Sequence, residues 1–174
     1  MSKKLLLTGQ PKAGKSTLIH KLIEEHSDRC YGFYTREMRE DDVRVGFEIV
    51  TINIPIEGGI LSHVNLKAEH VFGKYNIDTS TLDRVTHYLS CNPDKNRLLI
   101  IDEISPMTAF SEHTKEFVRN SLDSTQSVLA AVKMDSSPWS DSIKEIYKNK
   151  IPLKVLTIEN RDNLFKEVCA YYFS

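Results

Sequence analysis

Cysteine is scarce in this sequence, and the few cysteines lie far apart. Cys30, Cys91 and Cys169 form no CxxC pair and show no Cys/His spacing typical of a metal site. This spacing argues against disulfides and structural metal, and it predicts reduced, structural thiols in a cytoplasmic protein. The histidines include no HExxH pair, so we expect surface or core imidazoles. We expect His20 and His26, in the predicted helix 15–26, to face solvent.

Long apolar runs and a strong excess of charge are also missing. No run approaches the length of a membrane span, and Leu5–Leu7 is far too short for the apolar part of a signal peptide. A net charge of −1 at pH 7 argues against holding nucleic acid on a general basic surface, although a local basic groove stays open. We therefore expect a monomer with no membrane or nucleic-acid partner, and we leave a protein partner open.

The sequence does contain enough apolar residues for one core. With 174 residues, of which 40% are hydrophobic, it predicts a single domain over residues 1–174 without disulfide or metal support. Apolar runs such as 98–101 and 128–132 predict buried strands, and they alternate with segments of helical periodicity such as Lys15–His26. The pattern predicts an α/β fold in which helices cover a mostly parallel sheet, a three-layer α/β/α sandwich.

One part of the sequence departs from this alternation. Cys30–Arg36 and Arg44–Ile52 are rich in aromatic and β-branched residues, and they predict an antiparallel hairpin. Residues from about 30 to 62 are therefore expected to form an insert on the parallel core. Residues 72–78 predict a short, glycine-containing approach to the following helix.

The most informative stretch lies between the first predicted strand and the first predicted helix. It matches GxxxxGK[ST], the phosphate-binding loop (P-loop), in which glycines let consecutive backbone N–H groups face an anion at a helix N-terminus. Lys15 is expected to reach the β- and γ-phosphates of a nucleotide, and the Ser16 hydroxyl to ligate Mg²⁺. The expected nucleotide-binding residues of the loop are Gly9, Gln10, Pro11, Lys12, Ala13, Gly14, Lys15, Ser16 and Thr17.

A second chemical group follows the apolar run 98–101. Asp102 comes at the end of a predicted central strand, where a P-loop protein needs an acid that holds the metal. Glu103 is the candidate that orients or deprotonates an attacking water. The alternatives are a strand-end cap or ion pair for Asp102 and a plain surface acid for Glu103.

Several short motifs, taken together in order, cover almost the whole chain. They are residues 9–17, 32–37, 44–47, 73–75, 101–104 and 160–162. This set resembles the THEP1-type nucleoside-triphosphatases, small P-loop proteins. The resemblance implies Mg²⁺-dependent hydrolysis of nucleoside triphosphates to the diphosphate and phosphate, with broad tolerance of the base. It also implies a RecA-like arrangement of the sheet.

Two departures from the family pattern bear on activity. Lys12 stands where the family motif has a glycine, and we expect it to fit with a negative φ and to face solvent, with a contact to phosphate as the alternative. Ser105-Pro106 replaces a Gly-Lys, and Thr108 replaces an acid. If the family lysine touches phosphate or the catalytic acid, turnover here is slowed or lost while binding survives.

Four further residues fall in the family motifs. Arg44 and Lys74 are candidates for stabilising charge on the transferred phosphoryl group, and Arg44 is the one expected to be catalytic. Asn160 and Arg161 are candidates for the edge of the base. The alternatives are a solvated or cross-strand ion pair for the first two, and a cap of the last predicted helix by Asn160 or Asp162.

Three functions are compatible with these residues. The first is the hydrolase implied by the resemblance. The second is a nucleotide or nucleoside kinase, which needs an acceptor site and a basic lid. The third is a nucleotide-binding switch whose hydrolysis is weak or lost.

Overall fold

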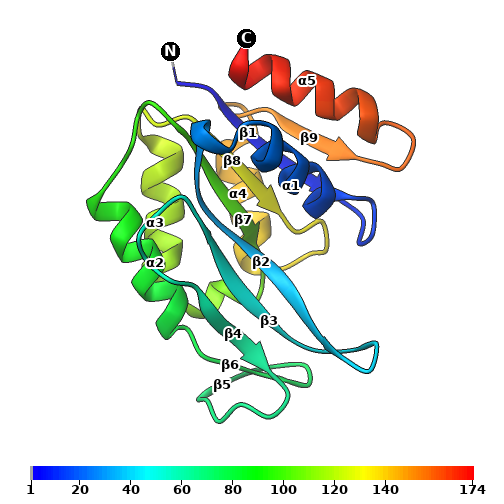
Figure 1. Cartoon of the computed structure of the whole chain (residues 1–174), viewed down its shortest axis with the longest axis vertical. Coiled ribbons are helices and arrows are strands. Elements are labelled where there is room, and N and C mark those ends of the chain that lie inside the picture. Colours follow the sequence, from blue (N-terminus) through cyan, green and yellow to red (C-terminus); the bar gives the residue numbers. More distant parts are fainter. Residues whose placement is uncertain (1) are drawn as a thin grey trace.

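The computed structural model describes residues 2–174, and its centre is one mixed nine-stranded sheet (Figure 1). The strand order is β5-β6-β4-β3-β2-β7-β8-β1-β9. The strands are β1 (Lys4–Gly9), β2 (Cys30–Glu40), β3 (Val43–Ile52), β4 (Gly59–His63), β5 (His70–Phe72), β6 (Tyr75–Ile77), β7 (Leu98–Ile104), β8 (Val128–Val132) and β9 (Leu153–Leu156).

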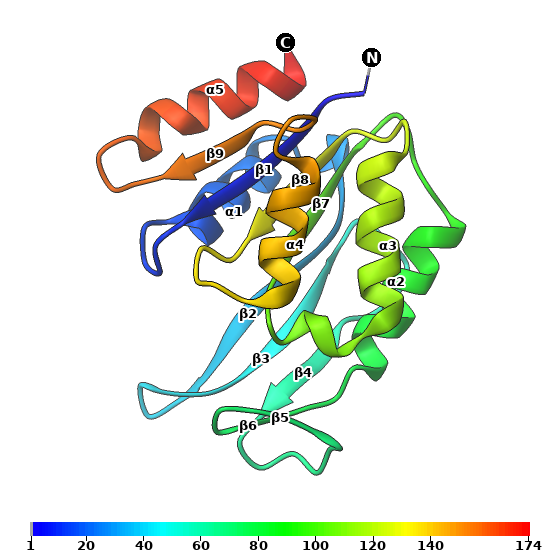
Figure 2. The same cartoon turned by 180° about the vertical axis from the view of Figure 1, so that it is seen from behind.

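Helices cover both faces of the sheet. They are α1 (Lys15–Glu25), α2 (Ser80–Cys91), α3 (Glu112–Asp123), α4 (Pro138–Tyr147) and α5 (Arg161–Phe173). α1 and α5 lie on one face, and α2, α3 and α4 lie on the other (Figures 1 and 2). Each face has its own cluster of buried apolar side chains, so the predicted three-layer sandwich is confirmed. Within residues 2–174, no helix combines the length and apolarity that crossing a bilayer requires.

Five neighbouring strands form the parallel half of the sheet. β2 pairs in parallel with β7, β7 with β8, β8 with β1, and β1 with β9. β8 therefore separates β1 from β7, as expected for a RecA-like sheet. Since parallel strands end at the same edge, the ends of β1 and β7 face the same side of the molecule.

The antiparallel half begins on β2 itself. Residues 30–34 of β2 pair with β7, while residues 32–40 pair with β3 in the predicted hairpin. The antiparallel strands then continue through β4 and β6 to β5, past the expected limit near residue 62. The prediction for residues 72–78 was wrong, because β5 and β6 form a tight hairpin around Gly73. Strands of three residues are too short for an alternating pattern to be visible.

Two helices begin at a capping serine. The Ser137 hydroxyl accepts a hydrogen bond from the Ser140 N–H, and Pro138 occupies the first turn of α4. Ser111 caps α3 in the same way, by accepting from the Thr114 N–H. The buried face of α4 contains Trp139, Ile143 and Tyr147, whereas Ile146 is 49% exposed.

Gly32 on β2 offers a test of the close approach between the backbones of β2 and β7. It has a φ of +129°, and a Cβ there would lie 2.2 Å from the Ile100 carbonyl oxygen of β7. We predict that Gly32→Ala lowers the free energy of unfolding by more than about 3 kcal/mol, because backbone strain adds to a clash that no side chain can relieve.

The matched control is Gly73→Ala, which also has a positive φ, +61°, but no atom within 4 Å of the added Cβ. It should cost only about 1–2 kcal/mol. Urea unfolding of both variants measures the difference. Equal losses would contradict the close approach of β2 to β7.

Candidate functional site

The P-loop leaves β1 at Gly9 and enters α1 at Lys15. The Ala13 N–H donates to the Gln10 carbonyl at 3.1 Å and closes the turn. Gly14 precedes the helix with a φ of 110°, and the first turn of α1 has neither a side-chain cap nor an acidic residue. The N–H groups at the start of the helix are therefore left for an anion, and the helix dipole favours negative charge there.

Lys15 reaches back across this loop. Its ammonium donates to the Gly9 carbonyl at 3.0 Å, so the side chain lies along the loop. The loop forms the floor of a cleft of about 520 Å³. We call this cavity the phosphate cleft, and its lining is Gly9, Pro11, Lys12, Lys15, Ser16, His20, Thr35, Arg36, Glu37, Arg39, Arg44, Phe47, Asp102, Glu103, Lys133, Met134 and Asp135.

The two acids at the end of β7 form the wall opposite the loop. Asp102 is buried, and its Oδ2 atom has no hydrogen-bond partner among the described residues. Burial raises the pKa of the Asp102 carboxyl to about 8, the Glu103 carboxylate adds to the rise, and the Lys15 ammonium opposes it. Burial also raises the pKa of Glu103, while Lys15 and Lys133 act against the rise.

The donor set at the cleft fits Mg²⁺. A buried carboxylate oxygen without a partner is an atom that a cation would satisfy, and the Ser16 hydroxyl lines the same cleft. Both are hard oxygen donors, which Mg²⁺ prefers together with water and phosphate oxygens. Asp102 and Ser16 are thus the residues that could hold it.

A small hydrogen-bonded turn follows the acids. The Ser105 N–H donates to the Thr108 hydroxyl at 3.0 Å, and that hydroxyl lies 3.1 Å from the carbonyl oxygen of Glu103. Both side chains are buried. The residues that depart from the family pattern here therefore form the turn that holds the backbone of Glu103. Pro106 lies outside the phosphate cleft, on two neighbouring pockets.

The β2–β3 hairpin brings three arginines to the cleft. Arg44 donates to the Tyr75 hydroxyl at 2.9 Å and to Glu37 at 3.1 Å. Arg36 pairs with Glu48 across the hairpin, and Arg39 pairs with Glu37. The sequence predicted only Arg44 here, because the cleft position of the other two depends on how the hairpin is attached to β7.

The remaining predicted residues divide between the cleft and other places. Lys74 lies in the turn between β5 and β6, with its ammonium 5.4 Å from the centre of the Tyr75 ring, and does not line the cleft. Gln10 and Ala13 shape the loop without lining the cleft.

Arg161 lies behind the loop. It lines a small pocket of about 70 Å³ between α1 and α5, together with Gly14 and Thr17. Asn160 forms no side-chain cap for α5. Its Oδ1 accepts from the Thr157 N–H and its Nδ2 donates to the Val155 carbonyl, so the amide is engaged in the turn before α5.

Two expectations at the cleft were wrong. Lys12 has a φ of +65°, not a negative one, so the lysine keeps the left-handed backbone that a glycine adopts easily. His20 was expected to face solvent, but its ring packs edge-on against Tyr34 at 4.4 Å and its Nε2 is buried without a partner among the described residues. Burial lowers the pKa of His20, Arg36 adds to that shift and Glu24 opposes it.

Lys133, Met134 and Asp135 were not predicted from the sequence. They follow β8, which lies between the two strands that carry the known motifs, and the Lys133 N–H donates to the Ile104 carbonyl. Their position after a fully buried strand was the available signal, since ligands of α/β sheets gather at strand ends.

A second cavity adjoins the phosphate cleft. Glu103 and Lys133 line both the phosphate cleft and a small neighbouring pocket. This small pocket in turn shares Phe72 and Pro106 with a cavity of about 480 Å³. The larger cavity is lined by Phe110 and Trp139, and the Arg119 guanidinium lies 5.0 Å from the centre of the Trp139 ring.

Fold and site together define a P-loop nucleotide-binding protein of the RecA-like kind. In it, β8 lies between β1, which leads into the P-loop, and β7, which carries the two acids. A family described as "NTPase" matches residues 4–169. "Nucleoside-triphosphatase THEP1" of Thermotoga sp. (strain RQ2) is 37% identical over 168 residues, which are 96% of this chain and 94% of that protein.

Solved structures agree. The crystal structure of THEP1 from Aquifex aeolicus has a TM-score of 0.83 and 27% identity, covering 98% of this chain and 99% of that one. The solution structure of a human cancer-related nucleoside triphosphatase has a TM-score of 0.74 and 28% identity, covering 97% and 96%. This chain belongs to the THEP1 nucleoside-triphosphatase family.

The turn behind Glu103 yields a stability prediction. Thr108→Val keeps the shape of the side chain but removes the hydroxyl that bonds to the Ser105 N–H and the Glu103 carbonyl. We expect the free energy of unfolding to fall by about 1–3 kcal/mol, because buried polar groups lose their partner.

Thr108→Ser is the control, since it keeps the hydroxyl, and it should recover most of the loss in urea unfolding. A Thr108→Val variant as stable as the parent chain would show that these hydrogen bonds do not hold the turn.

Proposed function

We propose that the phosphate cleft hydrolyses nucleoside 5'-triphosphates to the diphosphate and phosphate in a Mg²⁺-dependent reaction. The observation that carries this proposal is the buried Oδ2 atom of Asp102, which has no hydrogen-bond partner within residues 2–174 and lies beside Glu103 in the same cleft as the P-loop and Lys15. Membership of the nucleoside-triphosphatase family supports the same reaction.

The P-loop is proposed to bind the phosphates. Its backbone N–H groups surround the β-phosphate, and Lys15 leaves the Gly9 carbonyl to contact the β- and γ-phosphate oxygens. Ser16 and Asp102 are the residues that would hold Mg²⁺. When bound, the ion neutralises charge on the phosphate oxygens.

Glu103 is proposed to act on the attacking water. Its carboxylate orients the water and takes its proton while the water oxygen bonds to the γ-phosphorus. The bond from that phosphorus to the bridging oxygen breaks, and its electron pair stays on the diphosphate. Burial raises the pKa of Glu103, and Lys15 and Lys133 oppose this rise, which favours the charged carboxylate that this role needs.

The arginines of the hairpin are proposed to stabilise the transferred phosphoryl group, with Arg44 as the catalytic one. Its guanidinium is bonded to Tyr75 and Glu37, so contact with the γ-phosphate requires it to exchange at least one of these partners. Lys74 packs near the same tyrosine and would move with it if the β5–β6 hairpin approached the nucleotide.

Broad tolerance of the base is proposed from the surroundings of Arg161. Asn160, which was expected at the edge of the base, already uses its amide within the turn before α5. Arg161 then offers a flat guanidinium beside Gly14, and stacking on such a surface accepts any base. The monomeric state and the cytoplasmic location expected from the sequence remain predictions.

The second cavity supports one alternative, phosphoryl transfer to an acceptor other than water, as in a nucleotide or nucleoside kinase. Aromatic side chains and the cation of Arg119 would suit a planar, anionic molecule in this cavity, which adjoins the pocket that Glu103 lines. The third possibility, a switch without turnover, rests on the absence of the family lysine near Glu103. Lys133 argues against it, because this residue places a cation near Glu103.

We predict that Glu103→Gln lowers phosphate release about 10²–10⁴-fold while nucleotide binding is kept, because only the proton acceptor is lost. Lys15→Ala should remove both binding and turnover, and chelation of Mg²⁺ should stop turnover of the parent chain. Phosphate release is measured against a panel of nucleoside triphosphates, and binding by calorimetry with a non-hydrolysable analogue.

Glu145→Gln is the control, because Glu145 lies outside the cleft on α4, and it should leave turnover unchanged. Unchanged turnover in Glu103→Gln would remove that residue from the mechanism. Nucleotide consumption that depends on an added nucleoside or nucleoside monophosphate, without free phosphate, would favour the kinase. Tight binding without turnover would favour the switch.

A further inference from the structure

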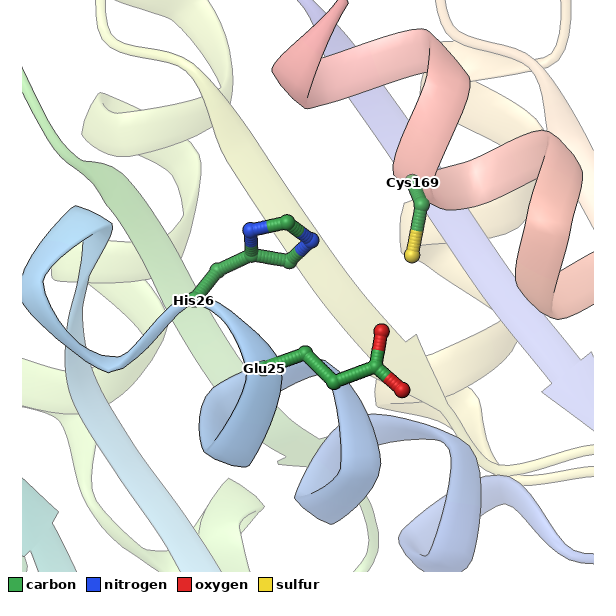
Figure 3. A group of neighbouring side chains, drawn as sticks. All are labelled: Glu25, His26 and Cys169. Atoms are coloured by element: carbon green, nitrogen blue, oxygen red, sulfur yellow. The ribbon is translucent and has the colours of Figure 1, made fainter.

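Three metal-ligating side chains meet at the end of α1 that is remote from the phosphate cleft. Glu25 and His26 end α1, and Cys169 lies on α5, which packs beside α1. Among residues 2–174, this is the one group of three such side chains whose ligand atoms all lie within 4.8 Å of one another. Figure 3 shows the carboxylate, the imidazole and the thiol converging on the space between the two helices.

We propose that Glu25, His26 and Cys169 bind a Zn²⁺ ion that fastens α1 to α5. Thiolate, imidazole and carboxylate together are typical zinc ligands, whereas Mg²⁺ selects oxygen donors. The ion is thus distinct in chemistry and in place from the one proposed for the cleft.

The distances suit a tetrahedral ion. Bonds of about 2.0–2.3 Å from zinc to nitrogen, oxygen and sulfur place neighbouring ligand atoms roughly 3.3–3.6 Å apart. Ligand atoms within 4.8 Å of one another therefore need only small side-chain rotations. Because Glu25 is exposed and the other two are partly exposed, a water molecule can take the fourth position.

The two helices hold the ligands in place before an ion binds. The His26 ring stacks on Phe173 of α5, with the ring centres 3.9 Å apart and an angle of 27°. Phe173 follows Cys169 by one helical turn, so both lie on the face of α5 that meets α1. The ring orientation is thus set by the same helix that supplies the thiol.

Neighbouring charges do not prevent binding. The Glu25 carboxylate pairs with Lys21 at 3.9 Å on an exposed surface, and such a pair is weak. Burial, with the Glu25 carboxylate beside it, raises the pKa of the Cys169 thiol, and Lys21 opposes this. A bound cation would reverse that balance and favour the thiolate.

The expected consequence is mechanical. α1 begins with Lys15 and Ser16 in the phosphate cleft and ends with Glu25, about 16 Å away along an 11-residue helix. An ion between its far end and α5 would stabilise the fold without touching the reacting groups.

The test uses Co²⁺ as a spectroscopic substitute for Zn²⁺ in the tag-free, full-length protein. The buffer contains a non-chelating reductant and excess Mg²⁺, which occupies oxygen sites. We expect one equivalent of Co²⁺ to give a thiolate charge-transfer band that Zn²⁺ abolishes, and we expect Zn²⁺ to raise the melting temperature.

Matched variants identify the ligands. Cys169→Ser should lose the band, whereas Cys91→Ser should keep it. Cys91 makes a useful control because its sulfur lies 3.8 Å from His87, but no third donor joins that pair among the residues described. His26→Phe, which keeps the stack on Phe173, and Glu25→Gln should each weaken Co²⁺ binding about tenfold or more.

The proposal is overturned if no band forms, if the band survives in Cys169→Ser, or if His26→Phe and Glu25→Gln bind Co²⁺ as the parent chain does. Melting curves in the presence of a chelator show whether each variant is folded, so a lost band is not mistaken for a lost fold.

Discussion

Two adjacent carboxyl groups near the end of β7 are the constraint on which the rest of the site depends. Asp102 is buried with an oxygen that has no partner among the described residues, and Glu103 follows it directly. Negative charge in such a place needs a cation or a proton. Lys12, Lys15, Lys133 and the arginines of the hairpin are the lysines and arginines that share the cleft with these acids. A metal-chelated polyphosphate between the P-loop and β7 would satisfy both sets of charges: its metal ion would pair with the acids, and its phosphates would pair with the positive groups.

The attachment of the hairpin to the parallel sheet decides what surrounds these acids. Tyr34 of β2 lies beside Asp102 of β7 in the parallel register. Residues that follow Tyr34 therefore extend past the end of the parallel strands and over the cleft, and this is how Arg36 and Arg39 come to line it. β2 thus belongs to both halves of the sheet, and Gly32 lets its backbone approach that of β7 closely.

The sequence predicted the features that depend on neighbouring residues. The P-loop and the acid strand are local patterns, and the parallel core followed from apolar runs such as β8. It did not predict the β5–β6 hairpin, because three-residue strands carry no period. Nor could it predict contacts between distant segments: the position of Lys133 next to Glu103, or that of Cys169 next to His26. The positive φ of Lys12 was missed because a lysine rarely adopts it.

The central claim is that Asp102 and the P-loop bind one magnesium-chelated triphosphate between them. The most direct test is calorimetric titration of a non-hydrolysable nucleoside triphosphate, with and without Mg²⁺, into the parent chain and into Asp102→Asn. The account predicts that Mg²⁺ tightens binding to the parent chain about tenfold or more, about 1.4 kcal/mol, and that this gain disappears in Asp102→Asn. An equal gain from Mg²⁺ in both proteins would contradict it.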